Sequence, residues 1–373
     1  MQFPQVARAV PIASAALAFA LTPTLGAPLV ARADGAALHQ VYANGNFQPT
    51  GISVSRSGRF FVNYPRWSDR YLNAVVEIAP DGRAKPYPNL AWNRWDGKAA
   101  TAGTHFICVQ SVVADGAGSL WVVDAAAPLL GPIVAGGPKL VQIDLTSNRV
   151  VRTILVPPAI AHSDSYLNDI RFDLARRTAY LTDSGHPGLI VVDLTSGIAH
   201  RALDGDPSVK VAPGVQVVVD GKRLLRNGKP PQFNADSIAL SPDGAYLYYK
   251  PVTAIELYRI KTSVLRASAS PAAVAAAVEP YAKTFPTDGL WMTKRGDLYL
   301  SDVTHDAVTR LTPDRRLERI VADRRLQWPD TFSQDPAGGD IFISSSQINN
   351  SRPYNGGVRT RTTPYAVYEF VPR

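Results

Sequence analysis

Residues 169–185 read DIRFDLARRTAYLTDSG, and residues 188–197 continue as GLIVVDLTSG. Each apolar run alternates apolar and polar side chains, with Ile, Val, Tyr and Phe at the apolar positions, which is typical of β-strands. The runs are separated by short segments rich in Gly, Asp and Ser, which favour tight turns. The stretch therefore predicts consecutive antiparallel strands joined by short turns.

The same arrangement occurs six times along the chain, which indicates a repeat architecture. The other five copies begin with GISVSRSGRFFVNYP (51–65), SVVADGAGSLWVVDA (111–125), SIALSPDGAYLYYKP (237–251), GLWMTKRGDLYLSDV (289–303) and TFSQDPAGGDIFISSS (331–346). Six antiparallel sheets around one axis form a β-propeller, which leaves only short protected edges. We therefore predict an all-β fold, a six-bladed β-propeller of four-stranded antiparallel blades.

A fourth strand is recognisable in four of the copies, at 83–88, 150–156, 199–204 and 317–322. The last copy has no sequence for a fourth strand after Phe370. We predict that the N-terminal segment LHQVYA (38–43) pairs there and closes the ring.

Two insertions interrupt the repeat. Residues 205–233 contain VQVVVDGKRLL, which predicts an extra hairpin that turns at Asp220-Gly221. Residues 262–283 contain SPAAVAAAVEPYA, in which Ser270 as N-cap and Pro271 at the first helical position predict a short helix.

The first 33 residues have the features of a secretory signal peptide. Arg8 supplies the positive n-region, residues 10–21 form a short apolar run, and residues 31–33 (Ala-Arg-Ala) fit a cleavage site, with residues 25–27 as an alternative. No later stretch is long and apolar enough to cross a bilayer. We predict a signal peptide over 1–33, one propeller domain over 34–373, and a secreted or periplasmic protein without membrane insertion after cleavage.

Charge and cysteine content limit the classes of function. Removing the signal takes away two arginines and no acids, so the net charge of +8 falls to +6. Lys and Arg are dispersed, and no basic run is interleaved with aromatics as a nucleic-acid groove requires. Cys108 is the only cysteine, so no internal disulfide can form, and its apolar surroundings predict a buried residue. We expect a small-molecule ligand and no nucleic acid; the sequence does not indicate the oligomeric state.

A polar group stands at the entrance of the first strand of every copy. The six entrances read Gln48-Pro49-Thr50, Gln110-Ser111, Asn168-Asp169, Asp236-Ser237, Thr287-Asp288 and Pro329-Asp330. Because the first strand of each blade lines the central channel of a propeller, these side chains are expected to converge at one mouth of it. Carboxylates brought together there repel one another unless a cation lies among them or some hold a proton.

These alternatives predict different chemistry at the mouth. A cation among oxygen ligands is most readily Ca²⁺, whereas a retained proton indicates a general acid or base. A third reading is that the residues cap turns and bind water in the channel. We take Asp236 and Asp288 as candidate catalytic residues and Asn168 with Asp236 as candidate metal ligands. The candidate substrate-binding residues are Gln110, Asp169, Asp330, Trp67 and Trp291, the two tryptophans as apolar walls.

Six segments in order resemble the royal jelly protein/Yellow family, in its bacterial branch. They are the first-strand regions of the six copies, from PTGISVSRSGRFFVNYPRW to WPDTFS and IFISSSQI, and the resemblance covers residues 40–371. It implies a secreted six-bladed propeller, in agreement with the repeat count. Some Yellow proteins are associated with dopachrome conversion, a tautomerisation, and others bind amines or sterols or serve as storage proteins.

A more distant likeness is to the SMP-30/gluconolactonase propellers. That likeness implies a divalent metal, usually calcium, held by a Glu at the first entrance, an Asn at a middle one and an Asp at the next. Asn168 and Asp236 match the last two, but Gln48-Pro49-Thr50 stands where the Glu is expected. Losing one anionic ligand weakens a calcium site and counts against lactonase chemistry, unless Asp288 or Asp330 compensates.

The sequence thus predicts an exported enzyme that acts on a small cyclic or aromatic molecule at the channel mouth. The reaction is a tautomerisation or a lactone hydrolysis, in which Asp236 or Asp288 moves the proton and Asn168 orients a carbonyl or an ion. The alternatives are a secreted protein that binds a small ligand without chemistry and, less favoured, an envelope scaffold.

Overall fold

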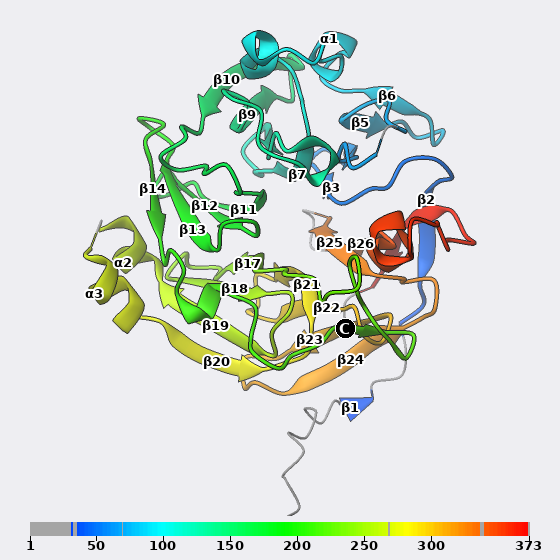
Figure 1. The fold of residues 1–373 in the computed structure, drawn as a ribbon, viewed down its shortest axis with the longest axis vertical. Coiled ribbons are helices and arrows are strands. Elements are labelled where there is room, and N and C mark those ends of the chain that lie inside the picture. Colours follow the sequence, from blue (N-terminus) through cyan, green and yellow to red (C-terminus); the bar gives the residue numbers. More distant parts are fainter. Residues whose placement is uncertain (1–30, 33–35, 69, 268, 336–338, 372–373) are drawn as a thin grey trace, which may run out of the picture.

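Six antiparallel sheets are arranged radially around a central channel in the computed structural model of this protein (Figure 1). The structure describes residues 31–32, 36–68, 70–267, 269–335 and 339–371. Each blade has four strands, which are consecutive in the chain in blades one to five, whereas blade six takes its fourth strand from the N-terminal segment. The fifth blade gains one further short strand. The predicted fold, an all-β six-bladed propeller, is confirmed.

In each of the first three blades, the four strands lie side by side in the order in which they occur in the chain, without a crossover. Blade one comprises β3 (Ile52–Val54), β4 (Phe60–Asn63), β5 (Val75–Ile78) and β6 (Ala84–Pro86). Blade two comprises β7 (Val109–Ala114), β8 (Ser119–Asp124), β9 (Lys139–Asp144) and β10 (Arg149–Leu155). Blade three comprises β11 (Leu167–Asp173), β12 (Thr178–Asp183), β13 (Gly188–Asp193) and β14 (Ala199–Ala202).

The last three blades repeat this order. Blade four comprises β17 (Ala235–Leu240), β18 (Tyr246–Pro251), β19 (Glu256–Lys261) and β20 (Glu279–Lys283). Blade five comprises β21 (Thr287–Met292), β22 (Leu298–Asp302), β23 (Ala307–Leu311) and β24 (Leu317–Ala322), with β1 (Ala31–Arg32) added in parallel to β24. Blade six comprises β25 (Pro329–Gln334), β26 (Ile341–Ser345), β27 (Tyr365–Phe370) and β2 (His39–Asn44).

The ring is closed by the N-terminal strand, as predicted. Strand β2 pairs antiparallel with β27, with His39 opposite Glu369 and Asn44 opposite Tyr365. The hydroxyls of Tyr42 on β2 and Tyr64 at the end of β4 are 2.6 Å apart. This bond ties the closing strand to blade one as well as to blade six.

The core lies between the blades, where apolar faces of neighbouring sheets meet. Trp121 of blade two and Phe172 of blade three are one such contact, with ring centroids 5.1 Å apart. Both rings belong to a cluster that also contains Ile170 and Leu181, which are fully buried. Alternation along the strands places these side chains on the packed faces.

Both insertions contain the elements predicted for them. The hairpin β15 (Val218–Val219) and β16 (Lys222–Arg223) turns at Asp220 and Gly221, both at positive φ. Helix α3 (Pro271–Ala276) begins after Ser270, whose hydroxyl accepts a hydrogen bond from the Ala273 amide at 3.3 Å. Two further helices are short: α1 (Leu90–Asn93) and α2 (Thr262–Arg266).

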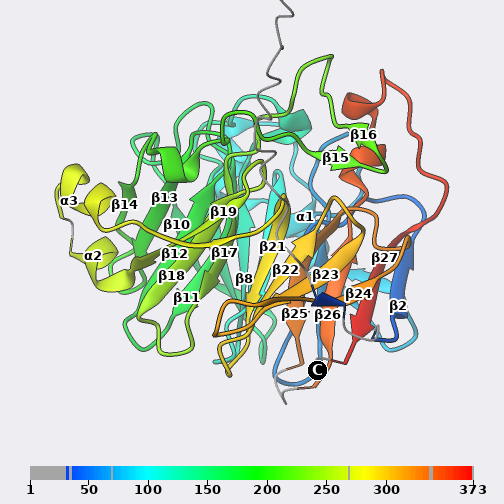
Figure 2. The same cartoon turned by 90° about the horizontal axis from the view of Figure 1, so that it is seen from below.

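The hairpin β15–β16 lies at the same end of the molecule as the long loop between β26 and β27 (Figure 2). Val219 of the hairpin belongs to one buried cluster with Trp328 and with Ile348 of that loop. Gln327 also donates a hydrogen bond from Nε2 to Asp220 Oδ2 at 3.3 Å. The two segments together build a cap over one mouth of the channel.

Three blades share an aspartate at the end of their second strand. Asp124, Asp183 and Asp302 are fully buried, and each accepts hydrogen bonds from backbone amides of neighbouring loops. In blade two, Asp124 also forms a 2.8 Å ion pair with Lys139, and both side chains are completely buried. These carboxylates hold the loops at the channel mouth.

The predicted signal peptide falls almost wholly outside the described residues, apart from Ala31 and Arg32. Among the residues that the structure describes, no helix has the length and apolar character needed to span a membrane. Export therefore stays a prediction from the sequence.

Candidate functional site: the channel mouth

The polar residues at the strand entrances lie where the pairing between the first and second strands of a blade is irregular. In blades two to six the ladder between the first and second strands shifts register just there, between Val109 and Ser111, Leu167 and Ile170, Ala235 and Ser237, Thr287 and Leu290, and Pro329 and Phe332. A β-bulge adds a residue to one strand and re-aims its side chain. The bulges explain how Gln110, Asn168, Asp236, Asp288 and Asp330 leave the pleated faces and reach the channel.

Hydroxyl groups join neighbouring inner strands around the axis. Ser111 donates to the carbonyl of Asn168 at 3.0 Å, and Thr182 donates to the carbonyl of Asp236 at 2.7 Å. Ser237 likewise donates to the carbonyl of Thr287 at 2.9 Å. Each bond spans two blades and fixes the backbone at or beside an entrance residue, so the site is positioned by the whole ring.

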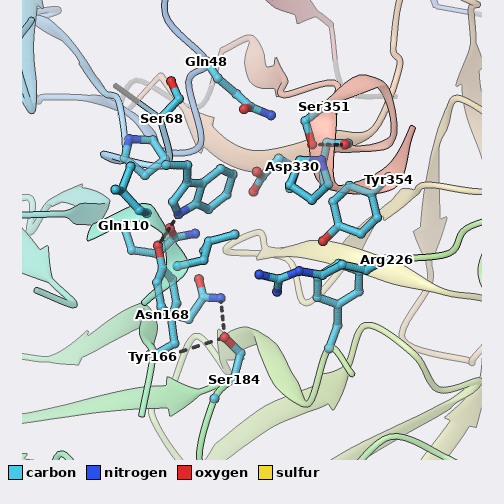
Figure 3. A pocket seen from close by; sticks show the side chains of 18 of the residues that line it. Gln48, Ser68, Gln110, Tyr166, Asn168, Ser184, Arg226, Asp330, Ser351 and Tyr354 are labelled. Atoms are coloured by element: carbon cyan, nitrogen blue, oxygen red, sulfur yellow. Dashed lines mark hydrogen bonds between the residues drawn. The ribbon is translucent and has the colours of Figure 1, made fainter. Parts of the chain in front are cut away.

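A pocket of about 1020 Å³ opens at this mouth (Figure 3). The lining includes five of the predicted entrance residues, namely Gln110, Asn168, Asp236, Asp288 and Asp330, together with the predicted Trp67. Gln48, where the first ligand of a gluconolactonase-like metal site is expected, also lines the pocket and donates from Nε2 to the Ser346 carbonyl at 2.7 Å.

Two predicted substrate-binding residues do not line the pocket. Asp169 is buried beside the channel, and its carboxylate lies 3.6 Å from the guanidinium of Arg171. Trp291 stands further along β21, where its Nε1 donates to Gln334 at 3.2 Å and its ring packs against an interblade cluster. Trp291 therefore fills space between blades, and Asp169 acts on the pocket only through its charge.

Asp236 and Asp288 form a hydrogen-bonded pair of buried carboxyl groups. Asn168 Nδ2 donates to Asp236 Oδ2 at 2.6 Å, and Trp328 Nε1 donates to Asp288 Oδ2. Burial raises the pKa of Asp288 to about 7, and the bond from Trp328 opposes that rise. Burial, with the charge of Asp288, raises the pKa of Asp236 well above its usual range. Both carboxyl groups therefore keep their protons to a higher pH than an ordinary aspartate does, and they titrate as a pair.

Asp330 and Asp169 belong to the same electrostatic cluster. Burial, with the charge of Asp288, raises the pKa of Asp330 well above its usual range. Burial also raises the pKa of Asp169, against the attraction of Arg171. In the described part of the chain, no Lys, Arg or His side chain lies within ion-pair distance of Asp236, Asp288 or Asp330. Repulsion among these carboxylates is therefore relieved by protons or by a bound cation.

The oxygen donors at the floor fit a calcium ion. Asn168, Asp236, Asp288 and Asp330 offer carboxylate and amide oxygens, the ligands that this hard cation prefers. Because no basic side chain of the described residues pairs with these aspartates, a bound cation would relieve the repulsion among their carboxylates. Asn168 and Asp236 would hold the ion only after the Asn168 amide turns its oxygen inward, because its Nδ2 now donates to Asp236 Oδ2 at 2.6 Å. Gln48 would supply a neutral group where an anionic ligand is expected.

Aromatic walls that the sequence did not single out surround the acidic floor. Tyr166 accepts a hydrogen bond from Trp67 Nε1 at 2.6 Å and donates to Gln110 Oε1 at 3.0 Å. On the other side, Phe233 packs edge-on against Trp328 with centroids 5.8 Å apart and also contacts Tyr354. Tyr166 directly precedes an entrance, which was a usable signal, whereas Phe233 comes from the 205–233 insertion and Tyr354 from the long loop between β26 and β27.

Four arginines also line the pocket, namely Arg70, Arg226, Arg352 and Arg359. Arg226, on the 205–233 insertion, lies among the lining side chains near Tyr354 (Figure 3). Among the described residues, no carboxylate lies within ion-pair distance of its guanidinium. The pocket thus combines a proton-holding floor, aromatic walls and several arginines, of which Arg226 has no carboxylate partner among the described residues.

The acidic floor gives a testable pH dependence of stability. Asp288 has a folded pKa of about 7 against 3.8 as the ordinary value, so its stabilising contribution is full below about pH 4 and is lost as the pH rises through about 7. We expect the thermal unfolding midpoint, measured with a chelator present, to fall between pH 5 and pH 8. Asp288→Asn should flatten this slope, while the exposed Asp81→Asn keeps it. A wild-type midpoint that rises over this range would contradict the assignment.

Fold and site together define a six-bladed β-propeller with a ligand-sized pocket at one mouth of its channel. Solved propellers match nearly the whole chain. A calcium-binding regucalcin from Agrobacterium tumefaciens has a TM-score of 0.54 and 11% identity, covering 92% of this chain and 95% of its own. A gluconolactonase from Xanthomonas campestris has a TM-score of 0.55 and 12% identity, covering 90% of each chain. At these identities the likeness shows the fold alone.

The sequence comparisons are more specific. The family model described as major royal jelly protein matches residues 107–354, which is more than half of the chain. Major royal jelly protein 1 of Apis mellifera is 24% identical over 218 residues, 53% of this chain and 46% of that protein. The match therefore spans about half the length of the honeybee relative. This chain belongs to the major royal jelly protein family, as the sequence resemblance indicated.

Proposed function

We propose that this protein is an exported enzyme that moves a proton on a small cyclic or aromatic molecule bound at the channel mouth. The reaction is a tautomerisation or the hydrolysis of a lactone. The single observation that carries the proposal is the buried, hydrogen-bonded pair Asp236–Asp288 at the floor of an aromatic-walled pocket. We further propose that the partner is a small molecule, with neither nucleic acid nor membrane insertion involved.

The two carboxyl groups supply an acid and a base side by side. In a tautomerisation, the carboxylate of Asp288 removes a proton from carbon while the protonated Asp236 gives one to the conjugated oxygen. In a lactone hydrolysis, Asp288 takes a proton from the attacking water and Asp236 protonates the departing ring oxygen. Asn168 positions Asp236 through its 2.6 Å hydrogen bond. In both reactions Asp288 gains one proton and Asp236 gives one, so the number of protons on the pair is unchanged.

Calcium at Asn168 and Asp236 is compatible with the lactone reaction. When bound, the ion supplies positive charge that polarises a carbonyl oxygen. The similar propellers include a protein described as calcium-binding and one described as a gluconolactonase, which supports this variant of the proposal. Asp236 would be ionised as a ligand of the ion, and Asp288 would then be the residue that holds or moves the proton.

The walls favour a flat molecule with a negative or carbonyl group. Trp67, Tyr166, Phe233 and Tyr354 line the pocket and offer ring faces and edges for stacking. Arg226 provides a cation at the rim that suits a carboxylate or a polarised oxygen. A molecule held by both would place its ring over the acidic floor.

A second candidate function is the binding of a small ligand without chemistry. It is favoured by the hydrogen bonds that link Trp67, Tyr166 and Gln110 in series, because they hold one aromatic wall of the pocket in a fixed position. Burial raises the pKa of Tyr166 well above its usual range, so this wall stays neutral and recognises a ligand without titrating.

Turnover assays separate the two functions. We expect the purified protein to convert at least one member of a panel of dopachrome-like compounds and lactones, assayed with and without calcium. Calorimetry on the same panel reports binding. Binding with no product from any member would establish the second candidate, and neither binding nor product would contradict both.

A further inference from the structure

Two histidines and an aspartate meet outside the acidic floor, at the same end of blade three. His162 lies in the loop before β11, His186 in the loop between β12 and β13, and Asp204 just after β14. One donor atom from each residue lies within 4.8 Å of the other two. The imidazole ring centroids are 4.3 Å apart, and the ring planes are inclined by 52°.

We propose that His162, His186 and Asp204 form a binding site for a transition-metal dication, with Zn²⁺ as the expected occupant. Imidazole nitrogen suits zinc and its first-row neighbours better than it suits calcium. Ligand atoms on a tetrahedral zinc lie about 3.3 Å apart, so the three side chains need to draw together only slightly. Asp204 is exposed and both histidines are half-buried, which leaves a fourth position for water.

A carboxylate orients one of the two imidazoles. Asp164 accepts a hydrogen bond from Nδ1 of His186, with distances of 3.1 and 3.2 Å to its two oxygens. A carboxylate behind a histidine in this way fixes the ring and raises its basicity toward a metal. His162 has no side-chain hydrogen bond within the described ranges, so its ring is free to coordinate.

Arg201 holds the three contributing segments in place. Its Nη1 donates to the Ile160 carbonyl at 2.6 Å, its Nη2 to the His186 carbonyl at 2.9 Å, and its Nε to Asp204 Oδ1 at 2.5 Å. The second oxygen of Asp204 has no hydrogen-bond partner in the part of the chain described. Arg201 is 6% exposed and also pairs with Asp183 at 2.9 Å. Arg201 thus pairs with Asp183 and Asp204, whereas Asp164 has only His186 as its partner among the described residues, so a dication at the two histidines would meet a favourable negative charge.

The site borders the pocket without sharing its acidic floor. Residues 163–166 follow His162 directly and line the pocket, and Gly185 before His186 does so too. A metal bridging His162, His186 and Asp204 would hold this wall against blade three. Zinc at the rim and an oxygen-ligated ion at the floor are therefore separable by ligand chemistry and by mutation.

Zinc titration of the full chain tests the proposal. After chelator treatment and dialysis, calorimetry with Zn²⁺ alone should show one site, and Co²⁺ should give a visible absorption band. His162→Gln and His186→Gln should each weaken Zn²⁺ binding at least tenfold, and Asp164→Asn should weaken it about tenfold to a hundredfold. His305→Gln is the control, because His305, which is 52% exposed, also bonds a carboxylate, Asp302 Oδ2 at 2.8 Å, on blade five.

Asp236→Asn separates this site from the pocket floor. That variant should bind Zn²⁺ with wild-type affinity, whatever it does to turnover. Zn²⁺ affinity unchanged by both histidine substitutions, or lost in Asp236→Asn, would overturn the proposal. Circular dichroism of each variant confirms that the propeller is folded, so a lost signal reports the ligand and not the fold.

Discussion

Asp288→Asn is expected to lower kcat/KM by about 10²–10⁴-fold on any substrate that the wild-type protein converts, the usual contribution of a positioned acid or base. The amide keeps the size of the side chain but cannot accept a proton from substrate. Because the pKa of Asp288 is raised to about 7, wild-type kcat/KM should rise with pH through about 7, and the residual activity of the variant should lose this dependence.

A matched control exists on blade five. Asp306 is also buried, and burial raises its pKa to about 7 too, but it does not line the pocket. Asp306→Asn should therefore keep kcat/KM within about twofold of wild type. If Asp306→Asn and Asp288→Asn lose activity equally, the loss reflects a general effect on the fold, and Asp288 is not the base.

Lys139→Met is expected to lower the free energy of unfolding by about 3–5 kcal/mol, the effect of removing one member of a buried ion pair. Methionine matches the length of the lysine stem but leaves the carboxylate of Asp124 buried without its 2.8 Å partner. Lys139 Nζ also donates to the carbonyls of Ala102 and Gly137, both at 2.9 Å. Two carbonyls therefore lose their donor as well. Urea unfolding followed by tryptophan fluorescence measures the change.

Lys98→Met is the control for that experiment. Lys98 is 76% exposed and its ammonium lies 3.9 Å from Asp96, an arrangement worth well under about 1 kcal/mol. Its substitution should shift the free energy of unfolding by no more than about 0.5 kcal/mol. Equal losses in the two variants would show that the buried pair contributes nothing special.

The blades could be predicted because each carries its own local pattern. Period-2 alternation and turn residues identify strands without knowledge of the rest of the chain, and the missing partner after Phe370 pointed to residues 38–43. Strand β20 was missed, because Glu279–Lys283 contains Pro280 and no run of β-branched residues. Its place in the sheet comes from pairing with β19, a tertiary effect that overrides weak local propensity.

The acidic floor could be predicted from topology, but the walls could not. Every first strand begins at the same mouth, so Asp236, Asp288 and Asp330 had to converge. Which of two adjacent entrance residues faces the channel depends on a β-bulge. The bulge between Leu167 and Ile170 explains why Asn168 lines the pocket while Asp169 does not. Arg226 comes from an insertion whose path over the mouth is set by packing between distant segments, which leaves no local signal.

The seam between β2 and β27 has a consequence for biosynthesis. Residue 44 lies opposite residue 365, so the contact that completes the circle joins positions that are 321 residues apart (365 − 44). Contacts of such long range form slowly, because the intervening chain must first be brought to order. Until blade six has been synthesised, strand β2 lacks its partner β27, and blade one has no blade six to pack against. The ring can therefore close only after the residues of β27 have been synthesised.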